Sequence, residues 1–523
     1  MRRMIKYVMT AVAVLVAASC DSFLNIQPDN RTEIDTEDKV TTLLTSAYPD
    51  ICFIMVTEMI SDNVDDFRIS YAETDRFSDE LFAWKDVTED DNESPENIWQ
   101  STYSAIAAAN EALKAIEAMG CNTTTLQHAK AEALLCRAYG HFLLANIFCM
   151  AYDSKTASKN LGVPYTTVPE VTLNPQYDRG TLDHVYEMID EDIQEALQLQ
   201  GDSYFQVPKY HFNKKAAYAF AARFYLYYEK WDLAEKYASL CLGNQPESLL
   251  RDWDVLGNLP STSYSQVVNQ FINVNEPANF LLCTAYSAVG LAFGPYAYYT
   301  AYSHGAYLSE TEDILAGNLW GSGFQAYRFE PRSYINALDR VIFWKIPYLF
   351  EYTDPVAGIG YFRTVYPVFW ADETLLSRAE ARVMTEDYDG AVQDINRWIH
   401  NFTTSTKDYT LNEIVRFYNS ADYHVWNKPT IKKHLHPGFD IGPEGSVKES
   451  LLQCIIGLRR IETQGQGMRW FDIKRYGIEI ERRVMDASGE PQAISDRLPV
   501  DDLRRAVQIP LKVTDANLQA NPR

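Results

Sequence analysis

Apolar residues recur at helical spacing along several long stretches of the chain. Residues 97–120, 129–148 and 181–199 repeat apolar side chains at positions i, i+3 and i+4, which is typical of amphipathic helices. Thr181 stands directly before the third stretch, where a helix N-cap is expected. The pattern predicts a mainly α protein.

Two further segments carry the pattern of paired helices. Residues 214–246 hold the small residues Ala222 and Ala234, and Ala379 and Ala391 stand at the same separation in residues 374–398. Small residues let two paired helices approach closely, as in tetratricopeptide helix–turn–helix units. We therefore predict a tetratricopeptide-like helix–turn–helix scaffold.

The helical pattern is interrupted between residues 247 and 370, which are rich in Gly, Pro, Tyr and Trp. A second irregular stretch runs from about 400 to 446. Insertions in helical repeats lie on one face of the scaffold, often the binding face. We predict a single unit over residues 20–523 that carries a large irregular, loop-rich insert at about 247–370, which binds the ligand.

The N-terminus has the pattern of a bacterial secretion signal. Arg2, Arg3 and Lys6 precede an apolar run that is too short for a stable membrane span, and small residues stand before Cys20. The letters "AAS" before Cys20 resemble a lipobox. We expect a lipoprotein signal peptide at residues 1–19 and lipidation of Cys20; a plain cleaved signal with an incidental cysteine is the alternative.

Charge and cysteine usage exclude some classes of protein. Lys and Arg number 47 against 71 Asp and Glu, a net charge of −24, and no basic block appears, so a nucleic-acid binder is excluded. The cysteines after Cys20 are scattered without a CxxC pair. They predict small buried apolar residues and no complete disulfide framework.

No catalytic motif is present. HExxH, GxSxG, the P-loop and GxGxxG are all missing from the sequence, which predicts that the protein is not an enzyme. His434 and His436 lack a third metal ligand at suitable spacing. The carboxylate-rich residues 86–96 favour a solvated acidic loop, with a structural Ca²⁺ ion as the alternative. We therefore expect no cofactor and no metal site.

Candidate ligand-binding residues gather in two regions, the polar residues 60–68 and the Gly/Pro-rich loop at 294–331 (the aromatic loop), with Trp84 as a further candidate. Aromatic side chains on a Gly/Pro-rich loop suit the apolar face of a sugar ring, and neighbouring polar side chains suit its hydroxyl groups. Packing is the alternative role for each aromatic residue. The polar candidates are Asp62, Asn63, Asp65 and Arg68, and the aromatic candidates are Trp84, Tyr296, Tyr298, Tyr299, Tyr302, Trp320 and Tyr327.

Several motifs together resemble one known family. They are "CDSFLNIQP", "WQSTYSAIAAANEAL", "AEALLCRAYGHFLLANIF", "LRRIETQGQGMRWFDIKRYG" and the closing "AVQIPLKVTDANLQANPR". They resemble the SusD/RagB family of outer-membrane nutrient-binding lipoproteins, although "GQGMRW" stands where the family often has Glu-Gly-x-Arg. The resemblance implies a SusD-like fold, a lipid-anchored protein facing the cell exterior, and a SusC-type TonB-dependent transporter as partner.

The most specific of these motifs contains residues 465–477. Asp472 is three residues from both Arg469 and Arg475, so a helix would place the three charges on one stripe. We predict a helix clamped to the scaffold by paired charges, with Trp470 and Phe471 buried; direct ligand contact is the alternative.

The ligand class follows from the resemblance and the aromatic loop together. We expect an oligosaccharide or polysaccharide that is captured and passed to the transporter. The same role for peptides, and a tetratricopeptide assembly scaffold without a small-molecule site, are the alternatives. A hydrolase has no supporting motif.

Overall fold

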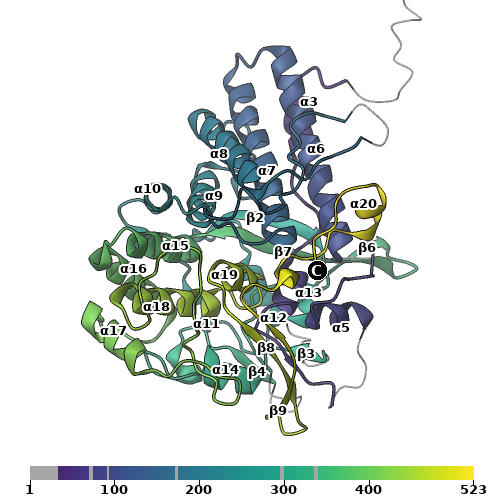
Figure 1. Cartoon of the computed structure of the whole chain (residues 1–523). Coiled ribbons are helices and arrows are strands. Elements are labelled where there is room, and N and C mark those ends of the chain that lie inside the picture. The colour runs from purple at the N-terminus through teal and green to yellow at the C-terminus, as the bar shows by residue number, and fades with distance from the viewer. Residues whose placement is uncertain (1–32, 70–74, 91–92, 171–174, 295–299, 335–339) are drawn as a thin grey trace, which may run out of the picture.

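Helices build most of the molecule (Figure 1). The computed structural model describes residues 33–69, 75–90, 93–170, 175–294, 300–334 and 340–523. The structure is 47% helical, so the mainly α prediction is confirmed. The helices are α3 (Glu37–Leu44), α4 (Ile54–Met59), α5 (Arg76–Phe82), α6 (Pro95–Met119), α7 (Thr124–Phe148), α8 (Leu182–Leu199), α9 (Lys214–Tyr227), α10 (Trp231–Leu242), α11 (Trp253–Gly257), α12 (Tyr264–Phe271), α13 (Val289–Ala292), α14 (Ala306–Glu312), α15 (Ala371–Met384), α16 (Tyr388–Phe402), α17 (Leu411–Ser420), α18 (Val447–Glu462), α19 (Arg469–Arg475) and α20 (Leu511–Asp515).

The helix ends follow local capping chemistry. The Thr181 side chain accepts a hydrogen bond from the backbone N–H of His184 and starts α8, as predicted. Ser94 caps α6 directly before Pro95, and Gly120 ends it with a left-handed φ of +91°. Figure 1 shows α6, α7 and α8 side by side at one end of the molecule.

The two predicted helix pairs are neighbours in space. Helix α9 packs on α10, α15 packs on α16, and α10 packs on α15. Ala222, Ala234, Ala379 and Ala391 are all buried at these contacts. The insert therefore leaves the scaffold after one pair and returns at the next.

The insert contains strands that its composition did not predict. β2 (Asn279–Tyr286) and β7 (Ile359–Trp370) pair antiparallel, and β6 (Leu349–Asp354) adds an edge in the order β2–β7–β6. β2 reads NFLLCTAY and is buried on both faces over most of its length, so it lacks the alternation that marks a half-exposed strand.

A second sheet joins distant parts of the chain. Its order is β3–β1–β8–β9, and β1 pairs antiparallel with β3 and parallel with β8. The strands are β1 (Asp65–Asp66), β3 (Tyr302–Ser303), β8 (Ile480–Met485) and β9 (Pro491–Leu498), and the short pair β4 (Arg332–Tyr334) and β5 (Arg340–Ile342) stands apart. This sheet brings the polar segment at 62–68 against the aromatic loop.

The two glycines of "GQG" hold a tight loop before α19. Gly465 and Gly467 have φ of +76° and +74°, and a Cβ atom at Gly467 would lie 2.3 Å from Thr57 Oγ1. Their N–H groups donate to the buried Glu58 carboxylate at 3.0 and 2.9 Å, and the Asn63 side chain donates to it at 2.9 Å. Glu58 thus fixes the loop to α4.

Glu58→Gln tests this attachment. The amide would place N–H donors against N–H donors at a buried site, so we expect a loss of about 2 kcal/mol in the free energy of unfolding. Urea denaturation followed by circular dichroism measures it, with Glu191→Gln at an exposed position of α8 as the isosteric control. An unchanged midpoint for Glu58→Gln would contradict the assignment.

Candidate functional site

Helix α19 is held by ion pairs. Arg469 forms a bidentate pair with Asp62, with both N–O distances 2.8 Å. Asp472 pairs with Arg459 at 2.7 Å and with Arg475 at 3.5 Å. The predicted pair between Arg469 and Asp472 is wrong: Arg459 of α18 occupies Asp472, and Arg469 takes its partner from the N-terminal part of the chain.

The rest of the motif packs inside the molecule. Trp470 and Phe471 are buried, as predicted. Arg475 and the Tyr476 hydroxyl both donate to Glu380 of α15, at 2.6 and 2.7 Å. The motif therefore ties α19 to the helical scaffold, as the structural interpretation predicted.

Asp62 is shared by two arginines. Arg460 lies 3.5 Å from its carboxylate and donates to its backbone carbonyl at 2.9 Å, while Arg469 pairs from another side. Burial alone would raise the pKa of Asp62, but the two guanidinium groups hold it well below its usual range. Asn63 accepts from Arg460 at 2.9 Å, which extends the network towards Glu58.

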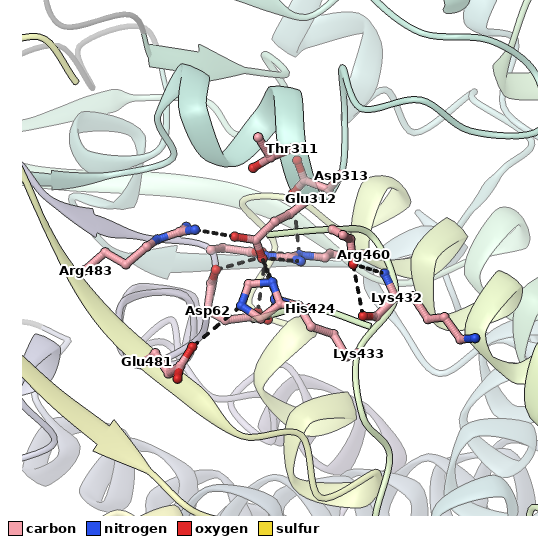
Figure 2. A network of polar contacts seen from close by, with 12 residues as sticks. Asp62, Thr311, Glu312, Asp313, His424, Lys432, Lys433, Arg460, Glu481 and Arg483 are labelled. Atoms are coloured by element: carbon pink, nitrogen blue, oxygen red, sulfur yellow. Dashed lines mark hydrogen bonds and ion pairs between the residues drawn. The ribbon is translucent and has the colours of Figure 1, made fainter. Parts of the chain in front are cut away.

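Glu312, at the end of α14, is the hub of this network (Figure 2). Arg483 and Lys433 each lie 2.5 Å from its carboxylate, and Arg460 lies 3.5 Å away. Burial opposes the charge, yet Arg483 and Lys433 hold the pKa of Glu312 well below its usual range. Arg483 also pairs with Asp65 at 2.8 Å.

His424 is the member of the network that lies beside a small recess, and it lines that recess. Lys433 donates to its Nδ1 at 2.9 Å, and Glu481 lies 3.8 Å from its Nε2 (Figure 2). Burial, and then the Lys433 charge, lower the pKa of His424, so the imidazole is neutral at neutral pH. Asp62, Asp65, Glu312 and Arg483 line the same recess.

Arg68 stands at the outer edge of this region. Its guanidinium is half-exposed, pairs with Asp66 at 2.5 Å and lies 5.6 Å above the centre of the Tyr302 ring. The Tyr302 hydroxyl donates to Asp79 of α5. The structure thus brings together the predicted residues Asp62, Asn63, Asp65, Arg68 and Tyr302, although most of them are buried.

Trp84 lies in the same region and contacts Ile60 and Arg482. Its Nε1 donates to the Ile60 carbonyl at 2.9 Å, and Arg482 stacks over its ring at 4.1 Å. The side chain is only 5% exposed. In this conformation Trp84 supports the sheet and presents no open ring face to a ligand.

Trp320 and Tyr327 lie elsewhere and pack against side chains of α16. Trp320 packs edge-on against Trp398, and Tyr327 against Phe402, and both are buried. They pin the aromatic loop to the scaffold, which was the alternative role. Tyr296, Tyr298, Tyr299, Cys20 and the signal peptide lie outside the described residues, so their roles stay predictions.

The sequence did not single out Glu312, Lys433, Arg460, Arg483 or His424. They come from different segments, and only the fold brings them together. One available signal was the unusual density of charge in an otherwise apolar stretch around "GLRRIE" at 457–462.

The acidic stretch at 86–96 is used within the protein. Asp86 pairs with Arg523 at 3.0 Å, and Lys512 pairs with Asp90 at 2.9 Å and with Glu96 at 2.6 Å. In the described part of the chain, no three His, Cys, Asp or Glu residues are grouped as a metal would require. The scattered cysteines Cys136, Cys149, Cys241 and Cys454 are free and buried, as predicted.

The comparisons with known proteins agree with the motifs. Residues 22–226 match the SusD-like family model described as "Starch-binding associating with outer membrane". A comparison with curated proteins gives no match. None of the described helices combines the length and apolar character that a membrane crossing requires.

Solved structures extend the likeness to nearly the whole chain. A SusD superfamily protein from Bacteroides thetaiotaomicron is 20% identical, with a TM-score of 0.60, over 93% of this chain and all of its own. One from Bacteroides vulgatus is 18% identical, with a TM-score of 0.60 over 94% and 99%. A SusD-like carbohydrate binding protein from Bacteroides vulgatus is 15% identical, with a TM-score of 0.58 over 92% and 96%.

These likenesses show the fold of the protein. The fold of the chain is SusD-like over nearly its whole length, and its N-terminal part also matches the family in sequence. The family resemblance predicted from the motifs is confirmed.

Asp62→Asn tests the network. The change leaves Arg469 and Arg460 buried without their shared carboxylate, and breaking a buried pair costs about 3–5 kcal/mol. We expect a matching drop in the free energy of unfolding, measured by urea denaturation. Asp90→Asn, which removes a carboxylate from an exposed pair, should leave the midpoint in place. Equal midpoints for the two variants would show that the network contributes nothing.

Proposed function

We propose that the protein is an outer-membrane lipoprotein, anchored through Cys20 and facing the cell exterior, that captures an oligosaccharide or polysaccharide. It delivers the glycan to a SusC-type TonB-dependent transporter. The family model, described as starch-binding, and the solved carbohydrate binding protein of the same fold support the ligand class.

One structural observation carries the proposed site. Arg68 is held by Asp66 over the Tyr302 ring, half-exposed, at the edge of a rigid network of buried charges. A guanidinium offers several donors in a fixed plane, which suits the oxygen atoms of adjacent sugar hydroxyl groups. Because its support is preorganised, little conformational freedom is lost on binding.

The proposed role involves no chemistry. Asp62, Asp65 and Glu312 each face a buried arginine within 2.8 Å. These pairs hold the carboxylates in fixed positions, so they are poorly placed to act as a general acid or base. We therefore propose reversible capture.

Arg68→Ala tests the glycan site. Native affinity gels that contain starch, xylan, laminarin or pectin should retard the mature chain in one of them. We expect the affinity of the variant for that glycan to fall by about 10-fold or more, because hydrogen bonds from a charged donor are lost. Arg416→Ala, at an exposed residue of α17, is the control. If no glycan retards the protein but a labelled peptide binds, a peptide ligand replaces the sugar.

The hairpin of β6 and β7 offers a surface for the proposed partner. Figure 1 shows β6 reaching out from the body of the molecule. Its exposed apolar side chains are Leu349, Phe350, Tyr352, Val356, Ile359 and Tyr361, and Val356 is 98% exposed. β6 is also an edge strand, whose free backbone groups suit a strand from another protein.

Charged substitutions on the hairpin test this partner surface. Tyr352→Lys combined with Ile359→Lys should abolish co-purification of the transporter with the tagged protein from gentle detergent extracts, and leave glycan retardation unchanged. Val168→Lys with Leu240→Lys adds the same charge at exposed apolar positions elsewhere and should co-purify normally. Undiminished co-purification of the hairpin variant would remove this surface from the proposal.

A further inference from the structure

A cavity of about 610 Å³ lies between α11, α12 and the end of α16. Its wall includes Gln270 of α12, Asn273 and Asn275 in the turn before β2, and Asn401 of α16. All the residues that line it belong to the described chain, and none belongs to the Arg68 region. The volume is in the range of small-molecule sites, roughly 300–1,000 Å³.

The charged side chains of this cavity are already engaged. Arg328 pairs with Asp254 at 2.8 Å, and Glu247 pairs with Arg397 at 2.6 Å. Asp252 accepts from the backbone N–H of Val255 as the N-cap of α11. Among the described residues Asp252 and Glu276 form no ion pair, so the lining keeps some negative charge and disfavours anionic sugars.

The amide side chains are engaged only in part. Over the described residues, no hydrogen bond uses the side chain of Asn275, the Nδ2 of Asn273 or the Oδ1 of Asn401. Gln270 donates weakly, at 3.4 Å, to the buried Glu276, and its Oε1 accepts nothing from these residues. Each side-chain amide can both donate and accept hydrogen bonds, as a sugar hydroxyl group can.

We propose that this cavity is a second glycan site, which takes uncharged sugar units through their hydroxyl groups. The inference rests on the proposed function and extends it to a site of different chemistry. The first site uses a charged guanidinium beside an aromatic ring, whereas the second uses neutral amides with no open aromatic face, since Trp253 is buried in its wall. Two weak sites on one protein retain a polymer more strongly than a short fragment.

The test compares matched double variants. Gln270→Ala with Asn275→Ala removes two amides from the cavity, and Gln266→Ala with Asn269→Ala removes the same side chains from exposed positions of α12 that do not line it. Binding is measured by isothermal titration with six- to eight-unit fragments of starch, xylan, laminarin and pectin, and by native gels with the parent polysaccharides. Thermal melting confirms that each variant is folded.

We expect the affinity of the cavity site for its glycan to fall by about 10-fold or more in the cavity variant, because two hydrogen bonds are lost. The control variant should bind as the wild type does. Arg68→Ala should retain the binding at the cavity site that the cavity variant loses. Equal binding by cavity and control variants, with Arg68→Ala reducing all binding, would overturn the second site and leave the proposed function intact. Failure of every protein to bind any glycan would overturn both.

Discussion

The burial of a balanced set of charges is the constraint on which the rest of the structure depends. Asp62, Asp65, Glu312 and Asp313 face Lys433, Arg460, Arg469 and Arg483, four carboxylates against four cations. A buried ion is costly unless it is paired with good geometry, and replacing such a network by apolar residues is often neutral for stability. The network therefore determines how the segments of the chain are placed relative to one another more than it adds stability. Each charged residue requires its partners, which come from five separate segments of the chain.

This arrangement explains why the polar segment at 62–68 and the loop after residue 300 meet at all. The strands β1 and β3 are two residues long, so their backbone pairing alone contributes little. Arg483 on β8 pairs with both Asp65 of β1 and Glu312 at the end of α14, which fixes the register of the small sheet. Arg68, just beyond β1, then stands on a support that cannot shift without breaking several buried pairs.

The helical scaffold could be predicted from the sequence because its signals are local. Periodicity located α6, α8 and the pairs that begin at α9 and α15, and Thr181 marked a helix start. The candidate site could be predicted only in part, because the partners of Asp62 and Asp65 lie some 400 residues away along the chain. For Trp320 and Tyr327, aromatic content alone could not separate packing from exposure, and the partner rings on α16 decided the outcome.

The cost of burying charge also separates the structural role of residues 465–477 from the proposed ligand-binding role of other side chains. The charged side chains of residues 465–477 are engaged inside the molecule, so none is left for a ligand. Arg469, Arg475 and Asp472 form ion pairs with Asp62, Glu380 and Arg459, and Lys474 donates to two backbone carbonyls, one in α7 and one in the segment after it. Its glycines serve the turn that Glu58 holds. The proposed ligand contacts therefore use side chains outside this motif, namely Arg68 and the partly engaged amides beside α11 and α12. In the proposed sites, polar side chains at the edge of a rigid charged interior would bind a ligand without disturbing the pairs that hold the fold together.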